Sequence, residues 1–147
     1  MILIFSMSSQ PAPESTATSL TVGRTICSVF VPGYRDMGTE KQLRLAQKID
    51  HPVRKTAHAT EYAILAVLIF AAMSDNNVRV RHYMISLVVT VSYAVTDEIH
   101  QYFVPGRACM VTDVMIDSCG ALAGLLLVFL VKIIGYGSMN FQNKQHN

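Results

Sequence analysis

The residues best suited to chemistry lie in the segment Ser92–Arg107, where an apolar run ends in Asp97, Glu98, His100 and Gln101. Two adjacent carboxylates and an imidazole can transfer protons or bind a polar ligand. A charged side chain at the centre of a membrane helix costs roughly 2.5–3.5 kcal/mol, so these groups need partners elsewhere in the chain.

Two other apolar segments carry polar groups that could supply those partners. Helical spacing places Lys55, His58 and Tyr62 on one helix face, with Glu61 beside His58. Asp113 and Asp117 begin a third apolar segment. The candidate catalytic residues are therefore His58, Glu61, Asp97, Glu98 and His100, and the candidate ligand-binding residues are Lys55, Tyr62, Gln101, Arg107, Asp113 and Asp117.

The composition indicates a membrane protein. Of the 147 residues, 51% are hydrophobic and only 15% are charged, against about 25% charged residues in an ordinary soluble domain. The mean hydropathy is +0.34. A net charge of +2, with scattered basic residues, argues against a nucleic-acid surface. The three cysteines form no metal-binding or disulfide pattern.

Three apolar segments are each long enough to cross about 30 Å of hydrocarbon, and they are Val53–Met73, Tyr83–Phe103 and Val114–Ile134. Successive spans run antiparallel, so the start of the first, the end of the second and the start of the third lie at the same membrane face. The polar residues listed above are therefore expected to meet there.

The ends of these spans have recognisable signals. Asp50 is a candidate N-cap with Pro52 in the first turn, and Thr112 is a candidate cap for the third span. The sequence predicts turns at Asp75–Asn77 and at Val104–Arg107, the latter of type II with proline then glycine at its centre. Gly135 and Gly137 are expected to end the third span, with Lys132 in its last turn.

We expect a single all-α membrane domain of 1–147. Residues 1–7 are interpreted as the remnant of a truncated first helix, 8–52 as an extramembrane connection, 53–134 as the spans and 135–147 as a polar tail. Within the connection, Val22–Val31 is either a strand or a surface helix, and Glu40–Ile49 is predicted to be an amphipathic helix. Gly120 and Gly124 form a Gly-xxx-Gly seam for close helix packing.

Three runs resemble the VanZ-like family of small integral membrane proteins: FSMSSQPAPES (Phe5–Ser15), RKTAHATEYAILAVL (Arg54–Leu68) and the segment Ser92–Gly124. The resemblance implies a multi-pass protein of the cell membrane with four helices, although Met7 interrupts the element that ends the first helix. The family is associated with reduced susceptibility to the glycopeptide teicoplanin. The basic residues near the span ends are balanced between the two sides of the membrane once Lys55 and Arg107 are assigned to the site, so charge does not decide the orientation. The association with teicoplanin then favours placing the polar cluster outside the cell.

Three classes of function fit the polar cluster. The first is a protein that binds or shields an envelope-associated ligand, with a membrane lipid, a cell-wall precursor or a glycopeptide as partner. The second is an intramembrane hydrolase or transferase, with Glu61 or Glu98 as general base, His58 or His100 as proton carrier, and Lys55 or Arg107 stabilising negative charge. A proton-coupled transporter is least favoured, because no internal repeat is visible.

Simpler interpretations stand beside these. Lys55 can serve only to anchor the helix end at the membrane surface, and Asp113 only as a favourable first-turn charge. A metal site built from His58, Glu98, His100 and Asp117 is not favoured because no recognised ligand spacing is present, so no metal and no cofactor is expected. The sequence leaves the oligomeric state open.

Overall fold

The computed structural model describes residues 4, 8–9, 12–74, 79–107 and 109–145, and every regular element in this part of the chain is a helix. The elements are α2 (Ala12–Phe30), the short 3-10 helix η1 (Tyr34–Asp36), α3 (Thr39–Met73), α4 (Val80–Gln101) and α5 (Val111–Gln145). This confirms the all-helical fold class.

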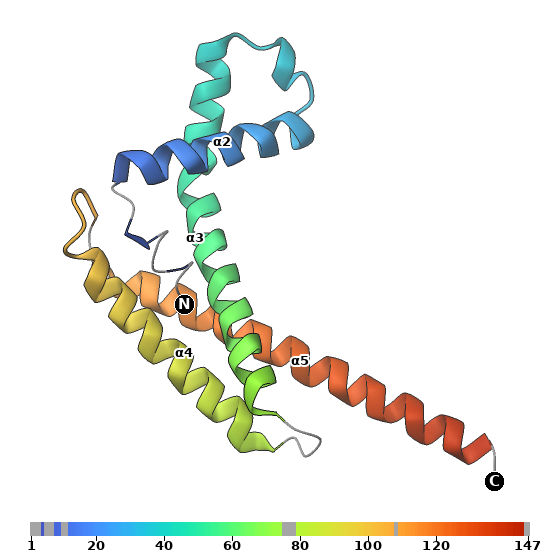
Figure 1. Ribbon diagram of the computed structural model, residues 1–147. Helices are drawn as coiled ribbons and strands as arrows, with labels where there is room; N and C mark the ends of the chain where they lie inside the picture. The colour runs from blue at the N-terminus through green and yellow to red at the C-terminus, as the bar shows by residue number, and fades with distance from the viewer. Residues whose placement is uncertain (1–3, 5–7, 10–11, 75–78, 108, 146–147) are drawn as a thin grey trace.

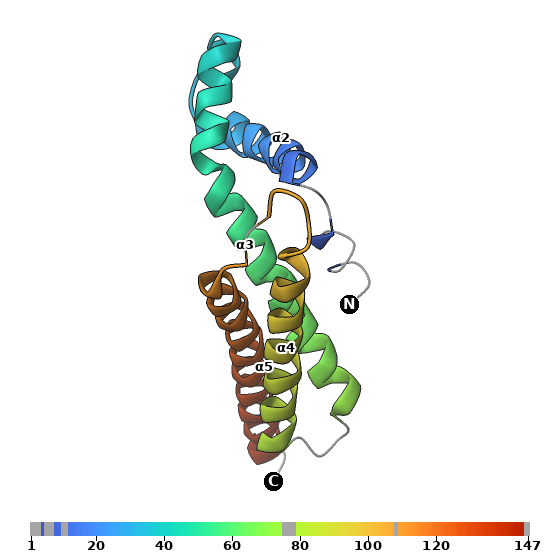
Figure 2. The same ribbon diagram turned by 90° about the vertical axis from the view of Figure 1, so that its left-hand side faces the viewer.

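The helix α3 connects the part of the molecule that contains α2 with the part that contains α4 and α5 (Figure 1). Its second half packs against α5, which is the most extensive helix pairing, and α4 lies against both of them. Its first half is crossed by α2 (Figure 2). As a result, the end of α4 and the beginning of α5 meet the middle of α3 just below α2.

A seam of small residues brings α3 and α5 into close contact. A Cβ atom added to Gly120 would overlap the carbonyl oxygen of Ala59, and one added to Gly124 would lie 2.7 Å from the carbonyl oxygen of Ala63. Below the seam, Phe70 and Leu125 pack in a common apolar cluster. The predicted Gly-xxx-Gly contact is therefore confirmed, and its partner helix is α3.

The helix α4 has its polar face inside and its apolar face outside. Its buried residues include His82, Ser86 and Thr90, whereas Val88 and Ile99 are more than half exposed. A helix on a water-soluble protein shows the opposite arrangement. A broad exposed apolar surface of this kind is typical of contact with lipid.

Two of the described helices are long and apolar enough to cross a membrane. They are α3, which contains an 18-residue stretch with a mean hydropathy of 1.5, and the Val111–Gly135 part of α5, which contains one with 2.3. The helix α4 is not among them, and Arg81, Asp97, Glu98 and several hydroxyl side chains lie within it. The prediction of three full spans is thus supported for two segments only.

The expected start of the first span is wrong. The helix α3 begins at Thr39, so Asp50 is not an N-cap and Pro52 lies inside the helix. Asp50 instead accepts hydrogen bonds from Ser19 of α2 and from Arg54 Nη2, at 3.0 Å for the latter. Packing of α2 on this part of α3 offsets the backbone hydrogen bond that Pro52 cannot make. Figure 2 shows that α3 changes direction beside α2.

The segment expected to be an irregular connection is largely helical. Val22–Val31 falls almost entirely within α2, so the helical alternative is correct, and Glu40–Ile49 is helical as part of α3. Whether this segment lies outside the membrane stays a prediction. Residues 1–7 lie mostly outside the described residues.

The other helix ends agree with the sequence only in part. The first span ends at Met73 as expected, and the turn predicted at Asp75–Asn77 lies outside the described residues. The type II turn is confirmed by a 3.1 Å hydrogen bond from the Arg107 N–H to the Val104 carbonyl, with a φ of 77° at Gly106.

The third span differs at both ends. The helix α5 begins at Val111, so Thr112 is inside its first turn rather than at its cap. It continues past Gly135 and Gly137, because an isolated glycine weakens a helix by only about 1 kcal/mol relative to alanine. Lys132 is consequently not in a last turn, and its ammonium lies 5.9 Å from the centre of the Phe70 ring.

Candidate functional site

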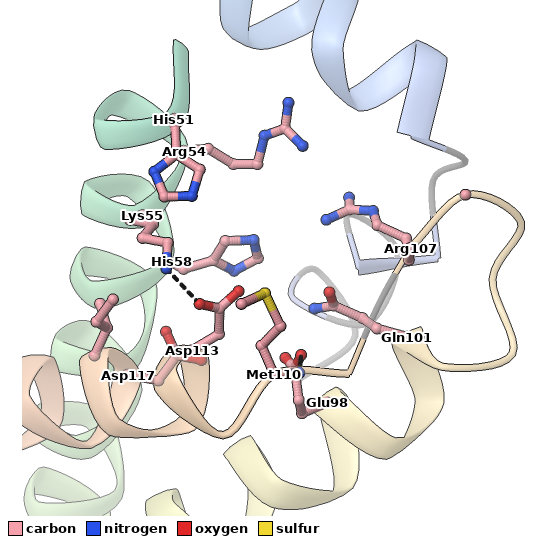
Figure 3. A pocket seen from close by; sticks show the side chains of 12 residues that line it. His51, Arg54, Lys55, His58, Glu98, Gln101, Arg107, Met110, Asp113 and Asp117 are labelled. Atoms are coloured by element: carbon pink, nitrogen blue, oxygen red, sulfur yellow. Dashed lines mark hydrogen bonds and ion pairs between the residues drawn. The ribbon is translucent and has the colours of Figure 1, made fainter. Parts of the chain in front are cut away.

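A pocket of about 190 Å³ opens where α3, the end of α4, the following loop and the start of α5 converge (Figure 3). Seven of the predicted site residues line it: Lys55, His58, Glu98, Gln101, Arg107, Asp113 and Asp117. Five further residues complete the wall: His51, Arg54, Gly106, Met110 and Ile116.

An ion pair joins α3 to α5 at the edge of this pocket. Lys55 Nζ lies 2.6 Å from Asp113 Oδ1, and both side chains are partly exposed. Thr112 Oγ1 also donates to Asp113 Oδ1, over 3.3 Å. The Asp113 charge is therefore balanced within the protein, and the pair fixes the separation of the two helices.

Two buried carboxylates form the deeper wall. Glu98 is 3% exposed, and its Oε1 accepts the backbone N–H of Met110 at 2.7 Å, which ties the end of α4 to the chain just before α5. Asp117 is 5% exposed and has no hydrogen-bond or ion-pair partner within the described part of the chain. Asp117 is thus the carboxylate most available to a ligand.

Two arginines occupy the opposite side of the pocket. The guanidinium groups of Arg54 and Arg107 lie in the upper part of Figure 3, and the carboxylates of Glu98, Asp113 and Asp117 lie in the lower part. Arg54 Nη2 donates to Thr16 Oγ1 at 3.1 Å and to Asp50 Oδ2 at 3.0 Å. Burial and the neighbouring Arg54 lower the pKa of Arg107, which nevertheless stays protonated because its ordinary value is so high.

Four of the predicted site residues lie outside this pocket: Glu61, which lines a second pocket, and Tyr62, Asp97 and His100. Tyr62 is fully buried beside Leu65 and Ala94. Asp97 is also buried, with Oδ2 accepting from Gln101 Nε2 at 3.2 Å and Oδ1 without a hydrogen bond among the described residues. His100 Nε2 lies 3.2 Å from the hydroxyl of Ser9, so it faces the N-terminal segment. Glu98 and Asp97 therefore have different surroundings, because adjacent residues of a helix point about 100° apart.

Glu61 lines a second, mostly apolar pocket of about 140 Å³ between α2 and α3. Its carboxylate Oε2 lies 3.8 Å from Nδ1 of His58. His58, Arg54 and Arg107 line both pockets, so they form the partition between them.

His51 and Arg54 belong to the pocket but are not among the residues predicted from the sequence. They precede His58 by seven and four positions, so they share its face if the helix continues in the N-terminal direction. A helix that starts at Pro52 excludes His51, whereas Arg54 lies within the predicted span and its spacing to His58 is visible in the sequence. Met110 is a loop residue whose role depends on its backbone N–H, which side-chain patterns do not reveal.

The arrangement can bind a ligand through charges of both signs. Among the described residues, no three histidine, cysteine, aspartate or glutamate side chains are placed to hold one metal ion. The guanidinium groups of the pocket can donate hydrogen bonds on one side, and its carboxylates can accept them on the other.

Comparison with known proteins gives one result. A family model described as VanZ/LLP1 matches residues 1–132, which include all the residues that line the pocket. The match also includes the residues of α2 and the first half of α3. No curated protein and no solved structure matches the chain.

Proposed function

The chain belongs to the VanZ/LLP1 family, and on that premise we propose that this membrane protein binds the polar group of an envelope-associated ligand in the pocket between α3, α4 and α5. The observation that carries the proposal is the pocket itself. Three helices with exposed apolar residues place charged side chains of both signs around one cavity, where the end of α4 and the beginning of α5 meet the middle of α3. Such charged groups among apolar helices are expensive to maintain and are typical of a functional site.

We further propose that α4 crosses the membrane together with α3 and α5, which makes the protein a multi-pass protein of the cell membrane. The outward apolar face of α4 supports this interpretation. Several of its polar residues, including Ser86 and Thr90, are buried, and there Ser86 donates to the His82 carbonyl and Thr90 to the Ser86 carbonyl. Thr96 is exposed, but its hydroxyl donates to the Tyr93 carbonyl of its own helix, which lowers the cost of contact with lipid.

Binding of a cell-wall precursor or a membrane lipid near a glycopeptide target would shield that target, and susceptibility to teicoplanin would then fall. The test is the inhibitory concentration of teicoplanin in a sensitive host that expresses the chain. We expect it to rise with the wild-type chain and to return toward the host value with Arg107→Gln. An unchanged inhibitory concentration with well-expressed wild-type protein would remove the shielding role and leave ligand binding to be tested directly.

The direct test of ligand binding is mass spectrometry of the molecules that co-purify with the full chain in detergent. We expect one class of envelope ligand to be enriched over the bulk membrane extract, and Arg107→Gln and Asp117→Asn to reduce that enrichment. Ser118→Ala is the matched control, because the Ser118 hydroxyl donates to the Val114 carbonyl of its own helix. Equal composition in all four preparations would contradict the proposal.

A second candidate function is an intramembrane hydrolase or transferase that acts on a lipid-linked or phosphate-bearing substrate. The observation in its favour is the proximity of His58 to Glu61, beside Arg107, which provides an imidazole, a carboxylate and a cation at one partition. Release of product from a lipid-linked phosphate by purified wild-type protein, but not by His58→Gln, would establish the enzyme. Retention of the ligand in stoichiometric amount without product would establish the binder.

A further inference from the structure

The charges of the pocket are divided by sign rather than mixed. The Arg54 and Arg107 guanidinium groups lie on one side, and the carboxylates of Glu98 and Asp117 lie on the other (Figure 3). Lys55 and Asp113 form one ion pair, and Arg54 forms another with Asp50, which does not line the pocket. The pocket therefore presents a positive side and a negative side to whatever enters it.

The negative side has a carboxylate that is available to a ligand. Asp117 is only 5% exposed and lines the pocket. It has no hydrogen-bond or ion-pair partner in the part of the chain that the structure describes. Glu98 lies on the same side, and among the described residues it accepts a hydrogen bond from the Met110 N–H alone. A buried carboxylate without a partner is unfavourable, so a cationic donor from the ligand would stabilise it.

The positive side suits an oxyanion. Arg54 is oriented by its bonds to Thr16 and Asp50, and Arg107 follows the fixed Pro105–Gly106 turn. Each guanidinium presents several N–H groups, and paired guanidinium groups match the geometry of a phosphate. The two arginines repel one another, and an anion between them would relieve that repulsion.

A ligand with only one charge fits this pocket poorly. A purely anionic group would lie next to Asp117 and Glu98, and a purely cationic group would lie next to the two arginines. We infer that the pocket binds a zwitterionic group with a phosphate toward Arg54 and Arg107 and a primary ammonium toward Asp117 and Glu98. This inference rests on the proposed function and names the class of ligand.

The same chemistry is available from two sources, an aminophospholipid in the membrane and a soluble phosphoethanolamine compound. The test uses the full chain in detergent and measures its affinity for three lipids: phosphatidylethanolamine, its N-acetyl derivative, and phosphatidylglycerol. The N-acetyl derivative has the same phosphate and lacks the ammonium charge. We expect phosphatidylethanolamine to bind about tenfold more tightly than the other two, as the loss of a charge-assisted hydrogen bond implies.

Two variants identify the groups responsible. Asp117→Asn is expected to bring the three affinities within about twofold of one another, whereas Arg107→Gln is expected to weaken all three. Ser118→Ala should behave as the wild type. Competition by soluble glycerophosphoethanolamine would show that the headgroup alone is recognised, and its failure to compete would show that the membrane lipid is required; either result supports the inference.

The outcomes also separate this inference from the proposed function. Equal affinity of the wild-type chain for all three lipids would overturn the zwitterionic ligand and leave a pocket that binds polar lipids. Tighter binding of phosphatidylglycerol would overturn it in the same way. Absence of binding to any of the three lipids and to soluble glycerophosphoethanolamine would overturn both this inference and the lipid-binding form of the proposed function.

Discussion

At the scale of single residues, the carboxylates of the site differ in what they contact. Asp113 pairs with Lys55, Glu98 accepts a backbone N–H, and Asp97 accepts the amide of Gln101, but Asp117 has no partner among the described residues. Residues of the same type thus have different surroundings: some link parts of the chain, and Asp117 is the one that we propose for a ligand. Sequence position alone does not distinguish them.

The Lys55–Asp113 ion pair is predicted to stabilise the junction of α3 and α5. Lys55→Met should lower the stability of the purified protein by about 1 kcal/mol, a modest value because both side chains are partly solvated. The measurement is thermal unfolding in detergent. Reversal of the pair in the double variant Lys55→Asp with Asp113→Lys should recover part of the loss, and a double variant no better than the sum of its single substitutions would show that the pair contributes nothing.

At the scale of the helices, the contact between α3 and α5 determines whether the pocket forms. Gly120 and Gly124 let the α3 backbone approach closely, and the pocket residues Asp113 and Asp117 lie on the preceding turns of α5. A shift of α5 away from α3 would therefore separate Asp113 from Lys55 and open the pocket.

Gly120→Ala is predicted to impair assembly, because its Cβ would overlap the Ala59 backbone, which cannot move as a side-chain end can. Overpacking of this kind typically destabilises by about 1–3 kcal/mol. The measurement is the yield of monodisperse protein and its unfolding temperature. Gly135→Ala is the control, because a Cβ there meets nothing within 4 Å. Equal behaviour of the two variants would contradict the described contact.

The helix α2 is held on α3 by polar contacts that meet at Asp50. Ser19→Ala removes the hydroxyl that Asp50 accepts, and it should weaken docking of α2 by about 1 kcal/mol. We expect faster amide hydrogen exchange in α2, with little change in α5. Thr21→Ala is the control, because the Thr21 hydroxyl donates to the Ala17 carbonyl of its own helix. Unchanged exchange in the Ser19 variant would show that α2 is held by other contacts.

The length and apolar character of three segments predict the helices that form the pocket. The sequence also predicts that polar residues near Lys55, Glu98 and Asp113 meet, because antiparallel spans bring those ends together. These parts follow from local pattern and chain direction. Seven of the predicted site residues accordingly line one pocket.

The remaining features depend on tertiary contacts. Pro52 indicates a helix start by its local effect, yet packing against α2 allows α3 to continue through it. Tyr62 shares the face of His58 by spacing, but the approach of α4 buries it in an apolar cluster. Glu98 is bound by a backbone group, the Met110 N–H, and the residue types in the sequence do not predict such a partner.

At the scale of the whole molecule, the apolar surfaces of α3, α4 and α5 imply a lipid-facing body with its pocket at one end. The orientation favoured by the family resemblance places that end outside the cell. Charge does not decide the orientation, since basic residues occur near both ends of the spans.

Thiol labelling tests this orientation in intact cells. Cys109 is exposed in the loop at the pocket end, so with Cys119→Ala it should react with a membrane-impermeant reagent. Val80→Cys, exposed at the other end of α4, should be protected when Cys109 and Cys119 are both replaced by alanine. The reverse pattern would place the pocket in the cytoplasm and remove the argument for a ligand outside the cell.

The most direct test of ligand binding is protection of the pocket itself. Met110→Cys lines the pocket and Phe103→Cys lies in the same loop outside it, each in a background with Cys109→Ala and Cys119→Ala. The measurement is the rate at which a small thiol reagent modifies each cysteine in delipidated protein, before and after addition of vesicles made from the host membrane extract. We predict that the vesicles slow modification at position 110 by about tenfold and leave position 103 within about twofold of its original rate. Equal slowing at both positions, or none at either, would contradict a ligand-binding pocket at this end of the molecule.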